Sequence, residues 1–206
     1  MAALPGTRRE VLLDAADRSV QRAGPEVSMA SIAAEAGITK PILYRHFGDK
    51  SGLYAALAER YTDRLLATLQ AALAAGGTAR ERLVRTVDAY LQAIEAEPQV
   101  YRFLLHSAET PSPAARGLVQ TFLRRFSDLL AQGISGELRL SADSIRAHVW
   151  AQAMVGMVQA AGDWWITSGR CSREQLVGEL VALLDGAYPA AVAMVRHEQA
   201  PRSSDG

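Results

Sequence analysis

The sequence predicts an all-α protein. Apolar residues recur at intervals of three and four along nearly the whole chain, and no strand-like alternation of any length interrupts them. Breaks that contain glycine or proline divide this pattern into segments, and serine or threonine precedes several segments where it can cap a helix. The early segments are short and the later ones are long, so we expect a small N-terminal three-helix domain followed by an antiparallel helical domain.

Composition excludes several classes of protein. The chain has 206 residues, of which 49% are hydrophobic and 21% are charged, so it is neither disordered nor fibrous. Lysine plus arginine equals aspartate plus glutamate, 22 against 22, so nucleic-acid binding would have to depend on a local basic patch. The single cysteine, Cys171, can form no internal disulfide and fits a reducing cytoplasm. With no secretion signal and no uncharged apolar stretch of about 18 residues, we expect a soluble cytoplasmic protein with no membrane partner.

Turn residues separate the N-terminal helices. Ser28 and Thr39 each precede a short helix that their hydroxyls can cap. Pro41 is tolerated because it lies in the first helical turn, where its missing N–H would have no partner. The expected N-terminal helices span residues 7–23, 29–36, 40–46 and 50–75.

The C-terminal helices are longer. Two sequences match the capping box, one from Thr78 to Glu81 and one from Ser172 to Gln175. A glycine-bearing loop is expected over residues 133–140, followed by a helix that Ser141 caps. The expected C-terminal helices span residues 78–96, 98–105, 114–132, 142–168 and 173–196. We expect domains at residues 6–66 and 78–197 and a disordered tail at 198–206.

The informative stretch is residues 28–47, which predicts a helix-turn-helix. Alanine at positions 33 and 36 lets the two short helices approach closely across the glycine turn. The residues placed to form the shared core are Ile32, Ala33, Ala36, Ile38, Ile42 and Leu43. The outer face of the second short helix is left free to enter a DNA major groove. Its exposed residues are Thr39, Lys40, Pro41, Tyr44, Arg45 and His46.

The local charge supports this interpretation. Ser28, Thr39 and the helix that starts near Lys50 place helix N-termini where they can receive phosphate groups. Between residues 39 and 50, three basic side chains face one acidic side chain, Asp49, so a basic patch exists although the chain is neutral.

Residues 28–54 resemble the DNA-binding signature of the TetR family of bacterial transcriptional regulators. The matching residues are Ile32-Ala33-x-x-Ala36-Gly37-Ile38-Thr39-Lys40, followed by Leu43-Tyr44-Arg45-His46-Phe47-Gly48-Asp49-Lys50-x-x-Leu53-Tyr54. The resemblance covers roughly the first 65 residues, and the long helices beyond are compatible with the sensor domain of that family. It implies a homodimer that binds double-stranded operator DNA, usually as a repressor, with activation as the alternative.

The resemblance also implies roles for individual residues. Ser28 takes the position of a phosphate contact. The start of the recognition helix lies against base edges, and a tyrosine, a histidine and a lysine hold the DNA backbone. The residues at these positions are Thr39, Lys40 and Pro41 for the bases and Tyr44, His46 and Lys50 for the backbone.

The last two helices predict a dimer interface. They carry apolar or small residues on more than one face, so each needs two partners, the domain core and most economically a second copy of the chain. A fully buried helix in a monomer is the alternative. The residues concerned are Ala147, Ala151, Met154, Gly156, Met157, Ala160, Leu180, Leu183, Leu184, Ala187 and Ala191.

Large aromatic or flexible residues in the second half suggest a cavity for a small, mainly apolar effector. His106 stands out because it lies on an apolar helix and could orient a polar group, although a hydrogen-bonded core histidine is the more ordinary role. Ordinary core packing is also the alternative for the whole set. The pocket candidates are Tyr90, Phe103, His106, Phe122, Phe126, Trp150, Met154, Trp164 and Trp165.

Two other classes of function compete with a regulator. An enzyme would need converging catalytic groups or a metal site, yet the four histidines fall in different elements without ligand spacing, so we expect no enzyme, cofactor or metal. A helical adaptor that binds protein would explain the neutral charge. It would not explain Thr39, Lys40, Tyr44 and Lys50 on one exposed surface.

Overall fold

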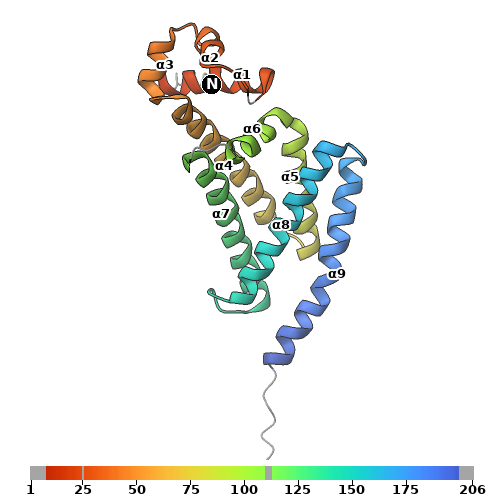
Figure 1. Ribbon diagram of the computed structural model, residues 1–206. Coiled ribbons are helices and arrows are strands. Elements are labelled where there is room, and N and C mark those ends of the chain that lie inside the picture. The colour runs from red at the N-terminus through yellow and green to blue at the C-terminus, as the bar shows by residue number, and fades with distance from the viewer. Residues whose placement is uncertain (1–7, 25, 110–112, 200–206) are drawn as a thin grey trace, which may run out of the picture. The chain divides into compact units, whose positions relative to one another are not determined.

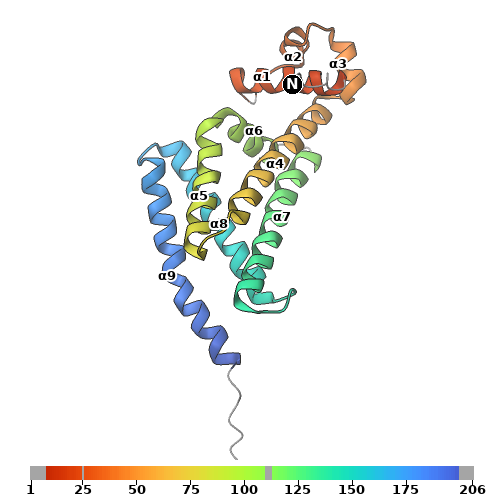
Figure 2. The same cartoon turned by 180° about the vertical axis from the view of Figure 1, so that it is seen from behind.

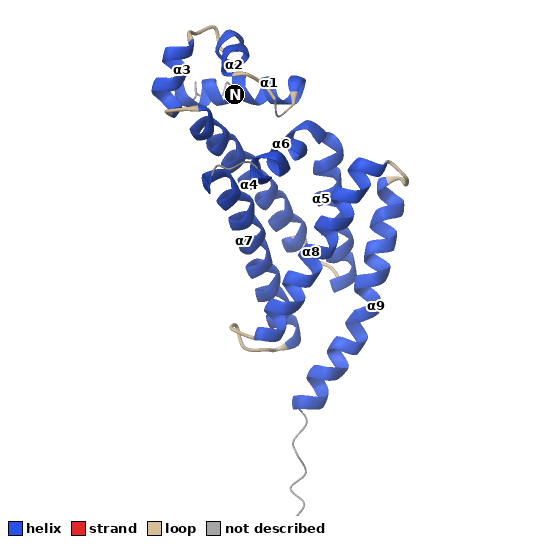
Figure 3. Cartoon of the chain, in the orientation of Figure 1, coloured by secondary structure: helices blue, strands red, loops and turns tan. Residues whose placement is uncertain are grey.

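The computed structural model describes residues 8–24, 26–109 and 113–199. These residues form nine α-helices and no strand, so the predicted all-α class is confirmed (Figure 3). The helices, labelled in Figure 1, are α1 (Arg8–Ala23), α2 (Met29–Glu35), α3 (Lys40–Phe47), α4 (Lys50–Ala74), α5 (Ala79–Ala96), α6 (Pro98–Glu109), α7 (Pro113–Leu138), α8 (Ile145–Ser168) and α9 (Arg173–Gln199).

The first four helices begin and end within one residue of the predicted positions. Both capping boxes also form as predicted. The Glu81 backbone N–H donates to the Thr78 hydroxyl at 3.2 Å, and the Thr78 N–H donates to the Glu81 carboxylate at 2.8 Å. Ser172 and Gln175 make the same reciprocal pair at 2.9 and 3.2 Å. Local sequence signals therefore place most helix ends.

The predicted loop at residues 133–140 is wrong. Helix α7 continues through Gly133 and Gly136 to Leu138, and the chain turns only at Arg139, which has φ +53°. A glycine inside a helix costs about 1 kcal/mol relative to alanine. Here Ile134 packs on a buried cluster and Ser135 is buried, so tertiary packing outweighs that local cost.

The ends of α8 and α9 also differ from the prediction. Helix α8 begins at Ile145, and its cap is the Ser144 hydroxyl, which accepts from the Ala147 N–H, so Ser141 is not the capping residue. Helix α9 extends to Gln199, so the first two residues of the predicted tail are helical. The rest of that tail, residues 200–206, lies outside the described residues.

The chain divides into two compact units. The first comprises Met1–Thr68 and Ala93–Leu123, and the second comprises Leu69–Gln92 and Arg124–Gly206. In the first unit, α1, α2 and α3 gather around the first turns of α4, and α6 packs against α1 (Figures 1 and 2). The fully buried core side chains of this unit include Val20, Ile32, Leu43, Leu53, Leu57 and Phe103.

The junction between α3 and α4 requires glycine at two positions. Gly48 ends α3 with φ +78°, a conformation that residues with a Cβ rarely adopt. Asp49 then caps α4, because its carboxylate accepts from the Gly52 N–H at 2.7 Å. A Cβ on Gly52 would lie 2.1 Å from the Phe47 carbonyl oxygen, so only glycine permits this approach. The junction therefore holds the end of α3 directly against the start of α4.

In the second unit, α8 and α9 run antiparallel and are joined by a tight turn (Figures 1 and 2). Gly169 ends α8 with φ +59°, and the Trp165 indole N–H donates to the Cys171 carbonyl at 2.8 Å across the turn. Ala131, Ala147 and Ala151 form a buried cluster between α7 and α8. These small side chains let the two helices approach closely.

Candidate nucleic-acid interface

Helices α2 and α3 form the predicted helix-turn-helix. Leu43 and Phe47 lie four residues apart on α3, and both are buried in one cluster with Ile32 and Ala33 of α2. Residues at this spacing share one face of a helix. Burial of that face fixes how α3 is rotated about its own axis, and so which of its residues point to solvent.

The solvent-exposed side of α3 carries four of the residues predicted to contact DNA. Lys40, Pro41, Tyr44 and Arg45 are all exposed, and the spacing of about 100° per residue places them on one side of the helix. We call these four residues the recognition stripe. His46 lies away from it, half-buried, with its ring centroid 6.5 Å from that of Phe47.

The basic residues of this surface have no acidic partner. Among the described residues, no carboxylate pairs with Lys40, Arg45 or Lys50, whereas four arginines of the same unit, Arg18, Arg22, Arg60 and Arg64, bind carboxylates. Arg18 and Arg22, for example, both bind Glu35, at 2.9 and 2.5 Å, and these two arginines lower the pKa of Glu35. The cations of α3 and the start of α4 therefore remain available to a phosphate in a chain of zero net charge.

The two predicted capping residues behave differently. The Ser28 hydroxyl accepts from the Ser31 N–H at 3.1 Å and caps α2 as predicted. Thr39 occupies the N-cap position of α3 with extended backbone, but its side chain makes no capping hydrogen bond, so that part of the prediction is wrong. The Thr39 side chain is exposed, and its hydroxyl is not committed to the helix backbone.

Two side chains that the sequence analysis gave no role also lie at this surface. The Tyr54 hydroxyl donates to the Val27 carbonyl at 2.8 Å, and the Lys50 ammonium lies 5.0 Å from the Tyr54 ring centroid. Burial raises the pKa of Tyr54, and the nearby Lys50 charge opposes that shift. The Arg9 guanidinium lies 5.0 Å from the ring centroid of Phe47. The spacing of Lys50 and Tyr54, one helical turn apart, was the only sequence signal of these contacts.

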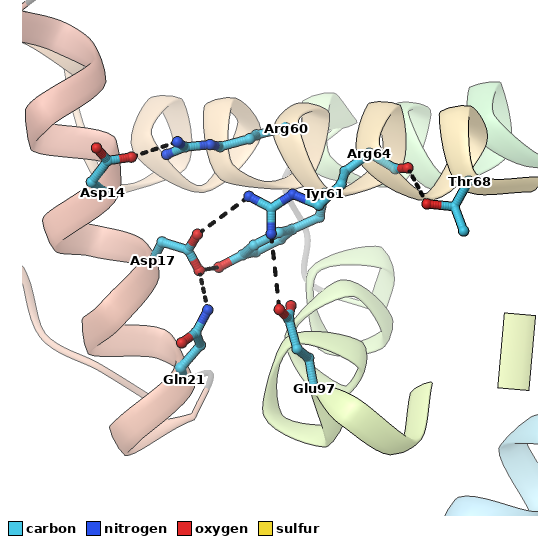
Figure 4. A network of polar contacts seen from close by, with 8 residues as sticks. All are labelled: Asp14, Asp17, Gln21, Arg60, Tyr61, Arg64, Thr68 and Glu97. Atoms are coloured by element: carbon cyan, nitrogen blue, oxygen red, sulfur yellow. Dashed lines mark hydrogen bonds and ion pairs between the residues drawn. The ribbon is translucent and has the colours of Figure 1, made fainter. Parts of the chain in front are cut away.

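A polar network joins three elements of the first unit (Figure 4). The Asp17 carboxylate of α1 accepts from the Tyr61 hydroxyl of α4 at 2.7 Å and from Gln21 at 2.9 Å. Arg64 lies 3.6 Å from Asp17 and 3.9 Å from Glu97, the residue before α6. Burial and the Asp17 hydrogen bond raise the pKa of Tyr61, so this tyrosine remains a neutral donor to the carboxylate. The network satisfies a carboxylate that is 8% exposed and ties α1 to α4.

The predicted pocket residues fall in both units. Phe103 and Phe122 belong to the first unit, where Phe103 is fully buried and packs edge-on against Tyr54 and Tyr61 at 5.0 and 6.0 Å between ring centroids. Trp164 is 49% exposed. The side chain of His106 lies outside the described residues. The members that the second unit buries or half-buries are Tyr90, Phe126, Trp150, Met154 and Trp165.

Tyr90 is the polar member of that second-unit group. Its side chain is 9% exposed, and burial together with the nearby Asp163 carboxylate raises the pKa of its hydroxyl. Burial also raises the pKa of Asp163, which directly precedes the two tryptophans in the chain. Tyr90 and Asp163 of the second unit therefore lie near each other, and Asp163 directly precedes two of the predicted pocket residues.

Sequence comparisons decide the family. Residues 12–57 match the family described as "Bacterial regulatory proteins, tetR family", and residues 68–201 match "Tetracyclin repressor-like, C-terminal domain". The chain belongs to the TetR family. The first match contains α2, α3 and the start of α4, so the helix-turn-helix described above lies within the matched TetR-family region.

Relatives cover nearly the whole chain of this TetR-family regulator. An uncharacterized HTH-type transcriptional regulator of Mycobacterium tuberculosis, Rv0472c, is 29% identical over 203 residues, covering 96% of this chain and 86% of the relative. The HTH-type transcriptional activator FasR of Mycolicibacterium smegmatis is 29% identical over 163 residues, covering 79% and 74%.

Solved structures share the fold. A tetR-family transcriptional regulator from Streptomyces coelicolor aligns with a TM-score of 0.75 at 24% identity, covering 98% of this chain and 93% of that one. A TetR-like regulator from Rhodococcus sp. RHA1 aligns with a TM-score of 0.66 at 28% identity, covering 91% and 99%.

TetR-family membership establishes a DNA-binding transcriptional regulator from a non-enzymatic family. The described part of the chain holds no group of three or more histidine, cysteine, aspartate or glutamate side chains that could bind a metal. The family match therefore argues against the enzyme considered in the sequence analysis.

Ser28 and Thr39 should contribute unequally to the stability of the protein. Ser28→Ala should lower the free energy of unfolding by about 1 kcal/mol, because α2 loses its cap. Thr39→Ala should change it by no more than a few tenths of a kcal/mol, because no capping bond is lost. Chemical denaturation of both variants and the wild type measures the difference. Equal losses would contradict the two capping roles.

Proposed function

We propose that this TetR-family regulator binds its operator as a two-fold dimer and represses transcription until a small, mainly apolar effector lowers its operator affinity. The observation that supports operator recognition most directly is the recognition stripe, with exposed polar side chains and cations that no carboxylate neutralises. A protruding helix of this kind fits the major groove. Because regulators of this type read DNA in the bacterial cell, we also assign the protein to the cytoplasm.

The roles within the DNA surface follow from exposure and charge. Thr39, Lys40 and Pro41 lie at the N-terminal end of α3, the end that enters the groove in a helix-turn-helix, and we assign them to base edges. Phosphate contacts are supplied by hydroxyl groups and by cations. The residues assigned to the DNA backbone are Ser28, Tyr44, Arg45, His46 and Lys50.

An exposed apolar surface supports the dimer. Along α8, Ile145, Val149 and Met157 are 80%, 57% and 41% exposed, and the helix repeat places them on one side together with exposed Gly156 and Ala160. We call these five residues the α8 stripe. Ala147 and Ala151, also considered for the interface in the sequence analysis, are fully buried within the second unit and are not available to a partner.

Helix α9 also exposes apolar side chains. Leu183 and Met194 are 64% and 56% exposed and lie on one side of the helix with exposed Ala187. By length and composition alone, the segment Arg173–Val195 is apolar enough to cross a membrane, and 29% of its most apolar window is buried within the chain. A helix with a second apolar face needs a second partner, and a copy of the same chain supplies one through an isologous interface.

The effector proposal depends on the second-unit aromatic residues. Phe126, Trp150 and Met154 offer large apolar and polarisable surfaces, and the Tyr90 hydroxyl with the Asp163 carboxylate offers a small polar contact. Sites for small molecules typically combine an apolar lining with a few polar groups. A mainly apolar compound with one polar end fits that combination.

Activation is the second candidate function, because a relative that is 29% identical, FasR, is named as a transcriptional activator. Binding to an operator inside a promoter blocks polymerase, whereas binding upstream can recruit it, so the position of the operator decides between the two. The protein-binding adaptor, the other alternative, is not supported by the family match.

Lys50 should contribute to affinity for any DNA sequence, whereas Lys40 should contribute to sequence preference. With a duplex that the wild type selects from a random-sequence pool, Lys50→Ala should flatten the dependence of log Kd on log salt by about one unit and weaken all sequences alike. Lys40→Ala should relax preference at one base-pair position. Binding titrations at several salt concentrations test both. Wild-type affinity of Lys50→Ala at moderate salt would refute its assignment as a phosphate contact.

The dimer interface should be sensitive to charge on α8. Ala160→Glu should yield soluble monomers that bind the selected duplex weakly, because each half-site loses its linked partner. Ala71→Glu places the same charge at an exposed alanine of α4 and should leave the dimer intact. Light scattering should give twice the chain mass of 22.2 kDa for the wild type and for Ala71→Glu. A wild type that is monomeric at micromolar concentration would exclude the dimer.

Effector binding should weaken DNA binding. A lipophilic compound that raises the melting temperature should reduce affinity for the selected duplex by about 5- to 150-fold, the usual range of allosteric coupling. Repression predicts that adding this compound to cells raises transcription of the controlled gene, and activation predicts a fall. Compounds that stabilise the protein and leave duplex affinity unchanged would show that the site is not coupled to DNA.

A further inference from the structure

Tyr54 connects two residues that the proposed function assigns to the DNA backbone. Lys50 lies one helical turn before it on α4, and the Lys50 ammonium is 5.0 Å from the Tyr54 ring centroid. The Tyr54 hydroxyl donates to the Val27 carbonyl at 2.8 Å, and Val27 directly precedes Ser28. Ser28 and Lys50 are far apart in sequence, so this one side chain links their positions.

The Tyr54 ring is itself held in place. Its edge packs on Phe103, with 5.0 Å between ring centroids and an interplanar angle of 71°, and Phe103 is fully buried. Val27, at the other end of the hydrogen bond, is 4% exposed. Both supports of Tyr54 are therefore buried, while Ser28 and Lys50 are exposed.

We propose that Tyr54 is a positioning residue of the DNA-binding surface: its ring orients the Lys50 ammonium and its hydroxyl holds the segment that presents Ser28. The two proposed phosphate contacts then approach the DNA as one rigid pair, with less side-chain freedom to lose on binding. The inference rests on the proposed roles of Ser28 and Lys50.

Each half of the Tyr54 side chain has a separable effect. A lysine on an aromatic face gains modest electrostatic attraction and loses rotamer freedom before DNA arrives. The hydrogen bond to Val27 positions Ser28. The proposed phosphate contact of Ser28 is made by a neutral hydroxyl, so it neutralises no phosphate charge. Loss of the ring should therefore change the number of phosphate charges neutralised, whereas loss of the hydroxyl alone should not.

Tyr61 provides a matched control. It also lies on α4, also packs edge-on against Phe103, and also donates a buried hydrogen bond, to Asp17 at 2.7 Å. It contacts neither Ser28 nor Lys50 in the described contacts. A purely structural role of the tyrosine hydroxyl would make Tyr54→Phe and Tyr61→Phe equivalent in DNA binding.

The experiment uses the full chain and the duplex selected by the wild type. Tyr54→Phe should weaken binding by about 2- to 12-fold, the equivalent of one net hydrogen bond. It should keep the wild-type salt slope and abolish ethylation interference at one phosphate per half-site. Tyr61→Phe should retain that interference pattern, whatever its melting temperature.

Tyr54→Leu should flatten the salt slope by about one unit, as Lys50→Ala does, and the double variant Tyr54→Leu/Lys50→Ala should be no flatter than Lys50→Ala alone. If Tyr54→Leu keeps the wild-type slope while Lys50→Ala loses it, the positioning role is overturned and the proposed function stands. If Lys50→Ala keeps the wild-type slope and affinity, the Lys50 contact fails, and the positioning role is overturned with it. Melting temperatures confirm that each variant is folded at the temperature of the titration.

Discussion

The burial of Leu43 and Phe47 on one face of α3 is the constraint on which the proposed DNA-binding surface depends. Both side chains enter a core that α1, α2 and α4 share, so α3 cannot rotate about its axis without exposing large apolar groups. The recognition stripe consists of the residues of α3 that this packing leaves in solvent. A rotation by one residue, about 100°, would put Tyr44 in the place of Leu43 and turn Leu43 away from the core.

The same core explains how a chain of zero net charge presents a basic surface. Acidic side chains of the first unit are occupied by arginines that lie away from the recognition stripe, as Glu35 is by Arg18 and Arg22. The Asp17 network does this in a buried setting, where an unpaired carboxylate would be costly. Charge neutralisation is therefore local, and Lys40, Arg45 and Lys50 keep no carboxylate partner among the described residues.

The second unit buries small side chains and exposes large apolar ones. Its small buried residues, Ala131, Ala147 and Ala151, bring α7 and α8 close together, while larger apolar side chains such as Ile145 and Leu183 face outward. Outward apolar residues on two successive helices are hard to reconcile with an isolated chain in water. The aromatic side chains divide between the two units, because Phe103 serves the core beneath the DNA-binding surface and Trp150 belongs to the second unit.

By itself, the sequence determined the all-α class, most helix ends, the family signature and the exposed residues of α3 other than His46, because capping, glycine turns and helical periodicity act over a few neighbouring residues. Tertiary structure alone decided that α7 runs through Gly133 and Gly136 and that His46 is half-buried. It alone brought Tyr54 to Val27 and Asp17 to Tyr61. These outcomes depend on packing between residues distant in sequence, and no local pattern records which distant partner a side chain will meet.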